Sequence, residues 1–247
     1  MRLTRVHVPG PLEVGAEITL PDQAAEHLVR VLRLEAGAPL VLFDGAGGEY
    51  PATLGARIGK RVTARVNSHT TVDRESPLDL TLLQGVARGE RMDLIVQKAT
   101  ELGIARIVPV LAERSVVRVD AKRSDRKREH WQAIVESACE QCGRTRVPTV
   151  SEPLGLGDAV ATLPDNSARC LLSADGAESL VSFAARACAQ PLVLLIGPEG
   201  GLADNEQKFA RANGFVACRL GPRILRTETA GLAALSALQA VAGDFSS

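Results

Sequence analysis

The sequence predicts an α/β protein in which a parallel sheet with helices on both faces follows a small β-barrel. Two short apolar runs, 192–196 and 215–220, each end at glycine, as buried strands of a parallel sheet commonly do. From residue 78 onward, strand-like and helix-like patterns alternate, which indicates successive βα units. In contrast, the first 72 residues are mostly short strand-like runs separated by glycine-bearing turns, as in a small barrel.

The N-terminal region contains four expected strands and one expected helix. The strands are 5–8, 39–43, 49–54 and 61–66. The helix opens at residues 21–22 and runs to about residue 34, because its apolar side chains fall on one stripe. That stripe consists of Ala24, Ala25, Leu28, Val31 and Leu32. His27, Arg30 and Arg33 share the opposite face, which is either a solvated face balanced by Glu26 or a nucleic-acid contact.

A polar, proline-ended segment, 72–77, marks the expected domain boundary and divides the chain into residues 1–72 and 73–247. The expected elements beyond it are strand 78–84, helix 90–102, strand 106–110, a helix from about 123 to 142, alternating elements at 154–163, 169–173 and 179–189, the two apolar strands, and a buried helix near 232–241. In helix 90–102, the buried stripe is Met92, Ile95, Val96, Ala99 and Leu102. Arg91 and Lys98 share one outer edge of this helix, where both could reach a phosphate.

The loop after the first apolar strand has the composition of a ligand-binding turn. Gly197, Gly200 and Gly201 let the backbone approach a ligand closely, because no Cβ intervenes. In open α/β sheets, ligands bind beyond the carboxyl ends of the strands. Pro198 stiffens the turn, and Glu199 is its one charged side chain. Neither G-x-G-x-x-G nor G-x-x-x-x-G-K-[ST] occurs, so the spacing alone also fits an ordinary strand-to-helix connection.

The loop after the second apolar strand concentrates charges and hydroxyls just before an almost wholly apolar helix. These residues are Arg223, Arg226, Thr227, Glu228 and Thr229. Thr227 is the expected N-cap of the helix, and Glu228 suits the positive N-terminus of a helix. Two arginines at that end are electrostatically misplaced unless an anionic ligand or transition state accounts for them.

Composition excludes several classes of protein. The 247 residues contain no basic-then-apolar leader and no apolar stretch near the roughly 20 residues that span a bilayer, so we expect a cytoplasmic protein. Five scattered cysteines argue against a disulfide framework. Cys139 and Cys142 lack a second C-x-x-C and a nearby histidine, so no metal site is expected.

Charge and aromatic content do not by themselves indicate a nucleic-acid binder. The formal net charge is zero, and the basic run at 114–128 fits a solvated helix face. With one Trp, one Tyr and five Phe, the chain lacks the stacking platforms of single-strand binders. Trp131 is therefore expected to be packed, and any RNA contact should be made through phosphates and shape.

Longer motifs resemble a known family. The blocks IGPEGG and LGPRILRTETA closely resemble the RsmE family of 16S ribosomal RNA uridine-N3 methyltransferases, in the SPOUT superfamily. The resemblance continues upstream through EHLVRVLRL, LFDGAGGEY, RGERMDLIVQKATELGIARIVPVLAERSVVR and ESACEQCGRTRVP, and thus covers nearly the whole chain. It implies a SPOUT-type parallel sheet with a C-terminal trefoil knot at about residues 168–242, and a PUA-like RNA-binding barrel at residues 1–72. Periodicity alone would not indicate a knot.

The resemblance also implies a cofactor, partners and roles for individual residues. The cofactor is S-adenosylmethionine, and the implied cofactor-binding residues are Leu172, Ser173, Ile196, Gly197, Pro198, Glu199, Gly200, Gly201, Leu220, Gly221, Ile224, Leu225 and Thr229. The implied RNA-binding residues are His27, Arg30, Arg33, Arg88, Arg91, Lys98 and Arg114. The implied partners are 16S ribosomal RNA within the small ribosomal subunit and a second copy of the chain, with the C-terminal helix and segment 141–146 as candidate interface elements.

Three residues are candidates for the chemistry of methyl transfer to N3. Arg226 would stabilise the negative charge that develops on the uracil when N3 loses its proton. Glu199 or Glu228 would accept that proton or orient the base, and the sequence does not choose between them. Both carboxylates could also be structural, Glu228 as a helix-terminus charge and Glu199 as the partner of an arginine.

Two other functions remain open at the level of sequence. One is a SPOUT 2′-O-ribose RNA methyltransferase, against which the RTETA block and the N-terminal region both argue. The other is a non-catalytic RNA-binding assembly factor, against which Arg226 and the intact glycine loops argue.

Overall fold

The structure, a computed structural model, describes residues 3–59, 61–115 and 121–246, with side chains omitted at 121–123. It contains two compact units. The first unit comprises Met1–Glu75 with Glu136–Val147, and the second comprises Ser76–Val135 with Pro148–Ser247. The long helix α3 (Ala121–Cys142) contributes residues to both units.

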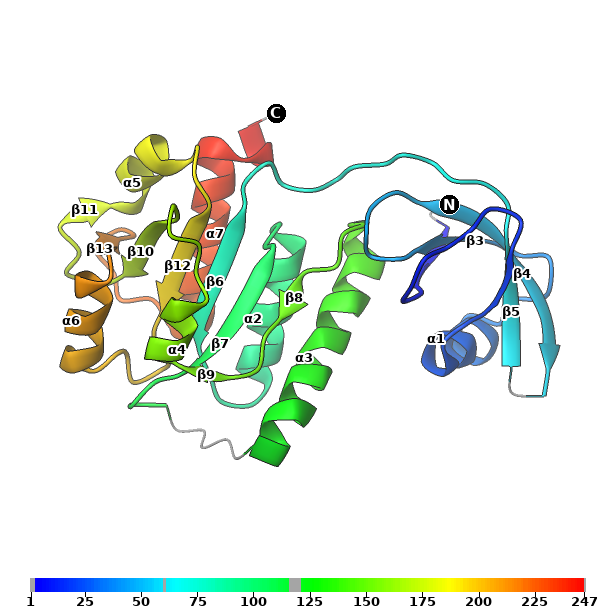
Figure 1. Ribbon diagram of the computed structural model, residues 1–247, viewed down its shortest axis with the longest axis horizontal. Helices are drawn as coiled ribbons and strands as arrows, with labels where there is room; N and C mark the ends of the chain where they lie inside the picture. Colours follow the sequence, from blue (N-terminus) through cyan, green and yellow to red (C-terminus); the bar gives the residue numbers. More distant parts are fainter. Residues whose placement is uncertain (1–2, 60, 116–120, 247) are drawn as a thin grey trace. The chain divides into compact units, whose positions relative to one another are not determined.

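The first unit is built on a small, mostly antiparallel sheet (Figure 1). Its strands are β1 (Thr4–His7), β2 (Glu17–Thr19), β3 (Pro39–Phe43), β4 (Tyr50–Ile58) and β5 (Arg61–Val66). Their order is β1-β3-β4-β5-β2, and β1 and β3 are the parallel pair. Leu28, Leu42 and Val62 are among the buried residues that hold this unit together. The strands predicted at 39–43 and 61–66 are confirmed, whereas β2 was not predicted because three residues show no periodicity.

The helix of the first unit differs from the prediction in its second half. It begins as α1 (Asp22–Glu26) and continues as a π-helical turn, η1 (His27–Val31), in which the Leu32 backbone N–H donates to the His27 carbonyl. The wider π turn rotates the following residues out of the apolar stripe. Val31 and Leu32 are 64% and 40% exposed, so the prediction that they face the core was wrong.

The segment 136–147 joins the first unit through buried charges. The Arg144 side chain donates to Glu75, with 2.8 Å between Nε and Oε2, and the Arg144 carbonyl accepts from Arg5. The backbone N–H groups of Thr145 and Arg146 both donate to Glu75 Oε1 at 3.1 Å. One carboxylate therefore anchors three consecutive residues, and the segment 141–146 is tied into its own unit.

The second unit is the predicted parallel sheet with helices on both faces. Its strands are β6 (Leu80–Gly85), β7 (Arg106–Leu111), β8 (Thr149–Val150), β9 (Leu154–Gly155), β10 (Ala168–Leu172), β11 (Glu178–Ser179), β12 (Leu192–Ile196) and β13 (Phe215–Arg219). Their order is β11-β13-β10-β12-β6-β7-β8, with β9 also paired to β7, and these pairs are parallel. β12 and β6 are buried throughout, which explains the continuous apolar run of β12.

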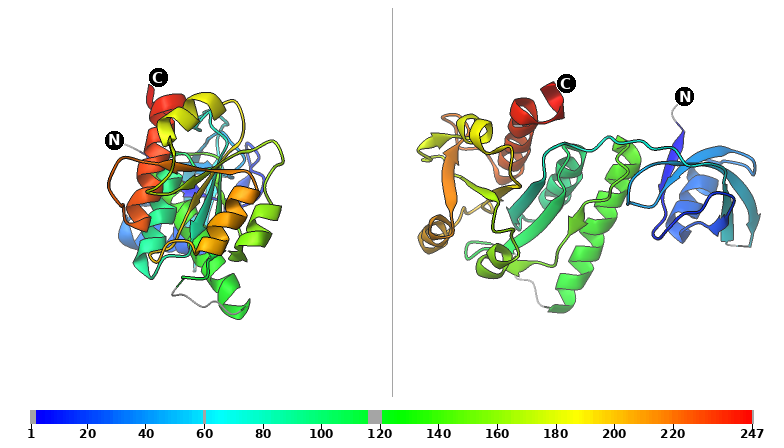
Figure 2. Two further views of the ribbon diagram at one scale, coloured as in Figure 1. Left: turned by 90° about the vertical axis from the view of Figure 1, so that its left-hand side faces the viewer. Right: turned by 45° about the horizontal axis from the view of Figure 1, so that its top comes forward.

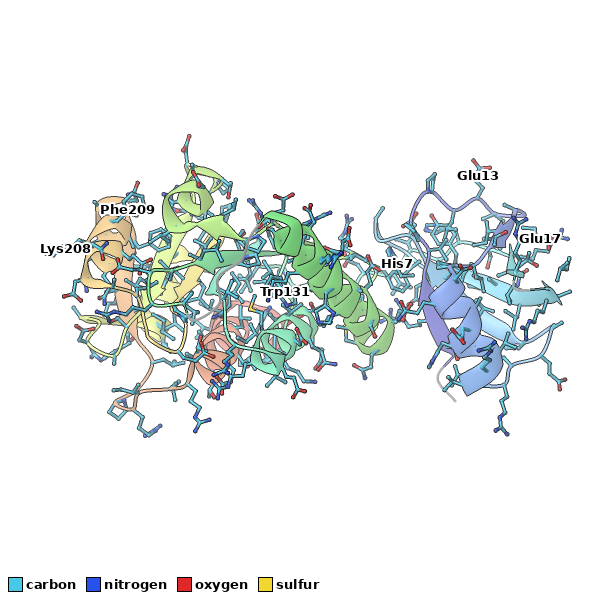
Figure 3. All side chains as sticks on the ribbon, turned by 90° about the horizontal axis from the view of Figure 1, so that it is seen from below. His7, Glu13, Glu17, Trp131, Lys208 and Phe209 are labelled. Carbon is cyan, nitrogen blue, oxygen red and sulfur yellow. The ribbon has the colours of Figure 1, made fainter. Side chains whose placement is uncertain are left out.

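Two groups of helices cover this sheet. The remaining helices are α2 (Glu90–Glu101), α4 (Leu156–Ala161), α5 (Leu180–Ala187), α6 (Asp204–Ala212) and α7 (Thr227–Ala242), followed by the short turn η2 (Asp244–Ser246). The left view of Figure 2 shows strands between α2 and α7 on one side and α4 and α6 on the other. α7 packs against both α2 and α5. The expected burial of Trp131 is confirmed, because it points from α3 toward α2 and is 2% exposed (Figure 3).

The strand order places a crossover at the centre of the sheet. The chain runs from β6 through β7 to β8 in one direction and then returns to build β10, β12 and β13 on the other side of β6. β13 lies two strands away from β12 in the sheet. The segment 220–226 leads from β13 to α7, and α7 packs against β12 and α2. The carboxyl ends of β10, β12 and β13 thus open toward the N-terminus of α7, at the kind of position where α/β sheets bind ligands.

Candidate active site

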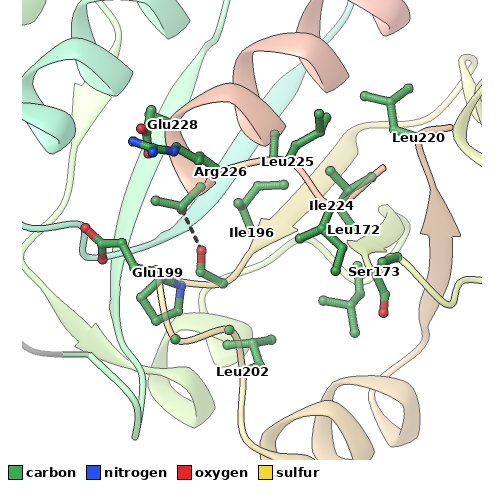
Figure 4. A pocket seen from close by; sticks show the side chains of 18 of the residues that line it. Leu172, Ser173, Ile196, Glu199, Leu202, Leu220, Ile224, Leu225, Arg226 and Glu228 are labelled. Atoms are coloured by element: carbon green, nitrogen blue, oxygen red, sulfur yellow. Dashed lines mark hydrogen bonds between the residues drawn. The ribbon is translucent and has the colours of Figure 1, made fainter. Parts of the chain in front are cut away.

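A cavity of about 580 Å³ lies at the carboxyl ends of β10 and β12 and the N-terminus of α7 (Figure 4). Its lining comes from segments 171–174, 196–202, 220–221 and 223–228, together with Arg91, Arg114, Gln207 and Ala230. The volume is within the range of small-molecule and cofactor sites. The two loops singled out in the sequence therefore form opposite walls of one cavity.

The glycine loop, residues 197–201, follows β12 and needs its glycines for close approaches. A Cβ at Gly197 would lie 3.0 Å from the Leu202 nitrogen, and one at Gly200 would lie 3.0 Å from the Arg114 Cβ. Gly201 has φ +68°, which favours glycine. The glycines thus permit close packing of protein atoms around the loop, and close approach of a ligand to the loop backbone stays a prediction.

Gly85, at the end of β6, was not singled out from the sequence but determines how the glycine loop crosses the sheet. A Cβ on Gly85 would lie 2.4 Å from the Pro198 nitrogen and 2.8 Å from the Gly197 carbonyl carbon. The sequence signal was a glycine that closes an apolar strand, at the end of LTLLQG.

Thr227 connects α7 to the glycine loop rather than capping the helix. The N-cap residue is Arg226, which makes no side-chain capping bond, so the predicted N-cap role of Thr227 was wrong. Thr227 is the first helical residue, and its buried hydroxyl donates to the Gly197 carbonyl at 2.6 Å, drawn as the dashed line in Figure 4. The same oxygen accepts from Gln84 Nε2 at 3.0 Å, so strand β6, the loop and α7 share one buried hydrogen-bond chain.

One end of the cavity is mostly apolar. Leu172, Ile196, Leu220 and Leu225 line it, and Ile224 is 88% exposed at its rim (Figure 4). Ser173, at the end of β10, also lines the cavity. All the residues predicted to bind cofactor line this cavity except Thr229, which is exposed on α7 and outside the lining. A contact of Thr229 with cofactor is not supported by its position, because Thr227 takes the inward place in the first helical turn.

The other end of the cavity is charged, with Glu199, Arg226 and Glu228 lying away from Leu172 and Leu220 (Figure 4). Arg91, Arg114 and Arg223 also line the cavity. Glu199 Oε1 accepts from the Arg88 backbone N–H at 2.9 Å and from Arg91 at 3.0 Å. Burial alone would raise the pKa of Glu199, but these hydrogen bonds and the Arg91 charge outweigh it and lower the pKa below its usual value.

Arg226 and Glu228 flank Thr227 at the start of α7. Arg226 is exposed, and its side chain makes no hydrogen bond or ion pair with any part of the chain that the structure describes. Glu228 has a side chain 15% exposed, and its Oε1 lies 3.9 Å from Arg91 Nε. Its other oxygen, Oε2, is buried and has no hydrogen-bond partner among the described residues. The three candidate catalytic residues thus lie around the same end of one cavity.

The residues predicted to bind RNA fall into different settings. Arg91 and Arg114 line the cavity, and Arg88 is exposed beside it. Lys98 pairs with Glu101 at 2.8 Å, so the outer edge that it was predicted to share with Arg91 is partly neutralised. His27, Arg30 and Arg33 are exposed on the first unit, where Arg30 pairs with Glu26. Part of the basic run at 114–128, including Arg118, lies outside the described residues. RNA contact by these side chains stays a prediction.

Metal ligation and membrane insertion find no support in the described residues. No group of three or more His, Cys, Asp or Glu side chains that could hold a metal ion occurs in those parts of the chain. Burial raises the pKa of the Cys139 thiol to about 12, which makes it a poor metal ligand or nucleophile at neutral pH. Within the described ranges, no helix is both long and apolar enough to cross a membrane.

Comparison with known proteins identifies the class to which this fold and cavity belong. The model of an RNA methyltransferase domain matches residues 74–239, and the model of an RNA methyltransferase PUA domain matches residues 20–67. A methyltransferase from Legionella pneumophila, solved with bound S-adenosylmethionine, is 37% identical with a TM-score of 0.93, over 99% of this chain and 100% of that one.

Two further relatives define the family. Ribosomal RNA small subunit methyltransferase E of Neisseria gonorrhoeae, solved with S-adenosylmethionine, is 39% identical with a TM-score of 0.91, over 99% of this chain and 100% of that one. The Bacillus subtilis protein of the same name is 32% identical over 92% of this chain and 91% of its own length. The fold and cavity are those of an RNA methyltransferase with a PUA domain. Within that class, the chain belongs to the ribosomal RNA small subunit methyltransferase E family, as its sequence motifs predicted.

Proposed function

We propose that this protein transfers a methyl group from S-adenosylmethionine to N3 of a uridine in 16S ribosomal RNA of the small subunit. The observation that carries the proposal is the single cavity in which the glycine loop, Arg226 and two carboxylates meet, in a chain of this family. The names of the relatives support ribosomal RNA as substrate, and the two solved relatives that hold S-adenosylmethionine support the cofactor.

The residues of the cavity fit S-adenosylmethionine. The apolar end, with Leu172, Ile196 and Leu225, suits a flat aromatic base, and the exposed backbone of the glycine loop suits polar groups of a ligand. The glycines at 197 and 200 allow the loop to fold tightly, because a Cβ at either would meet protein atoms at 3.0 Å. When bound, S-adenosylmethionine supplies an electrophilic methyl group.

The charged end suits the demands that N3 methylation places on the protein. A neutral imide nitrogen is a poor nucleophile, so its proton must leave, and the negative charge that spreads over O2 and O4 must be stabilised. Arg226 is suited to that stabilisation because it lines the cavity without a partner in the described chain. Removing one comparable charge-stabilising donor from an active site costs about 2.7–4 kcal/mol.

Identification of the methylated nucleoside tests this proposal. The protein is incubated with isotope-labelled S-adenosylmethionine and unmodified small ribosomal subunits, and the product is identified by mass spectrometry. We expect N3-methyluridine. A ribose-methylated product would instead assign the chain to 2′-O methylation. Absence of transfer, with cofactor binding intact, would favour the assembly-factor alternative.

We also propose that residues 1–72 act as an RNA-binding PUA-like domain and residues 73–247 as the methyltransferase domain. The two family matches, 20–67 and 74–239, support this division. The knot expected at about 168–242 is supported by the return of the chain from β13 to α7 across β10 and β12. Action on ribosomal RNA would place the protein in the cytoplasm.

Dimerisation is a further part of the proposal. Val181 on α5, Val241 on α7 and Phe245 of η2 are 50%, 37% and 55% exposed, and these elements contact one another. An interface there agrees with the predicted involvement of the C-terminal helix. The segment 141–146 suits an interface less well, because Arg144 and Thr145 are buried in the first unit. Light scattering of the eluted protein should give twice the chain mass of 26.1 kDa, and a monomer would contradict a homodimer.

A further inference from the structure

We propose that Glu228 accepts the N3 proton and that Arg91 is a positioning residue, which holds the Glu228 carboxylate at the cavity. The inference rests on the proposed uridine-N3 methylation and deepens it, because the sequence leaves Glu199 and Glu228 equivalent. It also gives Arg91 a role other than the phosphate contact predicted from its place on the outer edge of α2.

Glu199 is the carboxylate already committed to the protein. Its Oε1 accepts two hydrogen bonds, from the Arg88 backbone N–H at 2.9 Å and from the Arg91 guanidinium at 3.0 Å. Arg91 lies in the first turn of α2 and Arg88 lies two residues before that helix, so Glu199 fastens the glycine loop to the start of α2. These bonds lower the pKa of Glu199 despite its partial burial, which makes it a weaker base.

Glu228 is the carboxylate with an oxygen to spare. It lines the cavity, its side chain is only 15% exposed, and its buried Oε2 has no hydrogen-bond partner in the described chain. Neither carboxylate oxygen of Glu228 accepts a hydrogen bond in the described chain, so Glu228, unlike Glu199, keeps its accepting capacity for a ligand in the cavity. An N–H group of the substrate base is a donor of the right kind.

Arg91 links the two carboxylates. It hydrogen-bonds Glu199 at 3.0 Å, and its Nε lies 3.9 Å from Glu228 Oε1. With 45% of its side chain exposed, Arg91 forms part of the cavity rim rather than a buried strut. Glu199 orients Arg91, and the Arg91 guanidinium in turn holds the Glu228 carboxylate at the cavity through their opposite charges.

The charged groups that line the cavity with Glu228 come from four segments. Arg91 faces it from α2, Arg114 lines the cavity from the segment after β7, Glu199 from the glycine loop, and Arg223 and Arg226 from the loop before α7. Of these, Arg91 is the one that pairs with Glu228 within 4.0 Å in the described residues. Removing Arg91 should therefore be the change that most directly alters how Glu228 is held.

The reaction step balances as follows. The proton on N3 passes to the Glu228 carboxylate, and the electron pair left on N3 forms the new bond to carbon. The electron pair of the broken sulfur–methyl bond returns to sulfur, which becomes a neutral thioether. Arg226 stabilises the charge on the uracil oxygens while it lasts, and the proton on Glu228 is released to solvent after the product leaves.

The test is the pH dependence of kcat for methyl transfer to unmodified small subunits, at saturating cofactor, in matched variants. Glu228→Gln should lower kcat by about 10²–10⁴-fold. It should also remove the acidic limb, the fall of kcat on the acid side of the pH profile. Its activity should recover at alkaline pH, where the uracil imide ionises unaided. Glu199→Gln should keep the limb. Calorimetric binding of S-adenosylmethionine to each variant checks that the cavity is intact.

Arg91→Met should move the acidic limb of the profile, because Glu228 loses the charged group nearest to it. Arg91→Lys should restore it. Arg88→Met is the matched control, because it removes a neighbouring positive charge. The Arg88 side chain has no ion pair with either carboxylate in the described chain, so this variant should leave the acidic limb in place.

Two results would overturn the proposal. Loss of the limb in Glu199→Gln but not in Glu228→Gln would make Glu199 the base. A rise in KM for the subunit without a pH shift in Arg91→Met would return Arg91 to a phosphate contact. The nucleoside formed by the unmodified protein separates these failures from failure of the proposed function, because N3-methyluridine establishes the reaction whichever carboxylate serves it.

Discussion

Arg226 is the side chain on which the proposed charge stabilisation depends. It lies at the N-cap of α7, where the helix terminus is already positive, and it has no partner in the described chain. We expect Arg226→Ala to retain binding of S-adenosylmethionine and to lower kcat by about 10²–10³-fold. Calorimetry and single-turnover kinetics measure the two effects separately. Loss of cofactor binding in this variant would mean that Arg226 holds the cofactor rather than the uracil charge.

Gly85 should matter to the cavity as much as the glycines of the loop itself. Gly85→Ala would bring a Cβ to 2.4 Å from the Pro198 nitrogen, so backbone must move and about 1–3 kcal/mol of stability should be lost. Because Pro198 lines the cavity, we expect cofactor affinity to fall at least about tenfold, measured by calorimetry. Gly157→Ala in α4 is the matched control, since its nearest neighbour would be 3.9 Å away. Equal behaviour of the two variants would contradict the crowding argument.

At the scale of residues, the sequence identified most of the cavity but not the contacts that shape it. Glycine and charge patterns were sufficient to find the glycine loop and Arg226, because such residues have few structural uses at a strand end. Gln84 and Gly85 were missed, since their importance comes from a crossing of β6 by the glycine loop that lies more than 100 residues away in the chain. Thr227 was assigned the wrong partner for the same reason.

Among the elements, α2 and α3 are joined by a polar contact in an otherwise apolar interface. Trp131 Nε1 donates to Asp93 Oδ1 at 3.2 Å, and His130 Nε2 lies 3.1 Å from Asp93 Oδ2. Asp93→Ala would leave the indole N–H of a 2% exposed tryptophan without its acceptor, which should cost about 1–3 kcal/mol. Chemical denaturation measures this loss, and Trp131 emission reports it directly because it is the one tryptophan of the chain.

The matched variant for this contact is Asp93→Asn, which keeps one carbonyl oxygen to accept from the indole. It should recover most of the stability lost in Asp93→Ala. If both variants unfold at the denaturant concentration of the unmodified protein, the contact contributes nothing to the docking of α3.

Elements were predicted well where an apolar run has clear ends. β3, β5 and β12 match their predicted ranges, because each is a compact run bounded by turn residues or glycine. The strands of two or three residues, such as β8 and β11, have too few positions to show alternation. The π turn η1 was not predictable from a helical wheel, since a wheel assumes 3.6 residues per turn throughout.

For the whole molecule, the sequence pattern predicted a two-part chain but assigned α3 entirely to the second part. The structure groups Glu136–Val147 with the first unit. The cause is a set of charge contacts between residues distant in sequence, above all Arg144 with Glu75, which no local pattern reveals. The knot is equally invisible to periodicity, because it depends on the path of the chain and not on the type of any element.

Acid should destabilise the first unit through Glu49. This carboxylate is 14% exposed and pairs with Arg5 and with Arg74. Burial alone would raise the pKa of Glu49, but the two arginines outweigh it, and the pKa is lowered from the ordinary value of 4.5. A carboxyl with a lower pKa in the folded than in the unfolded state stabilises the fold above the unfolded pKa. That stabilisation is lost as the pH falls through the folded pKa.

We therefore expect the free energy of unfolding of the protein to fall as the pH drops below about 4.5. In Glu49→Gln, this free energy should depend less steeply on pH. Urea denaturation at a series of pH values between 3 and 7 provides the comparison. Glu49→Gln should be less stable than the unmodified protein near pH 7, and the two should converge in acid, where both side chains are neutral.

Glu26→Gln is the matched control, because Glu26 pairs with Arg30 on an exposed helix face, where an ion pair contributes little. Parallel pH profiles for the unmodified protein and Glu49→Gln would show that the carboxylate charge at this position does not stabilise the first unit.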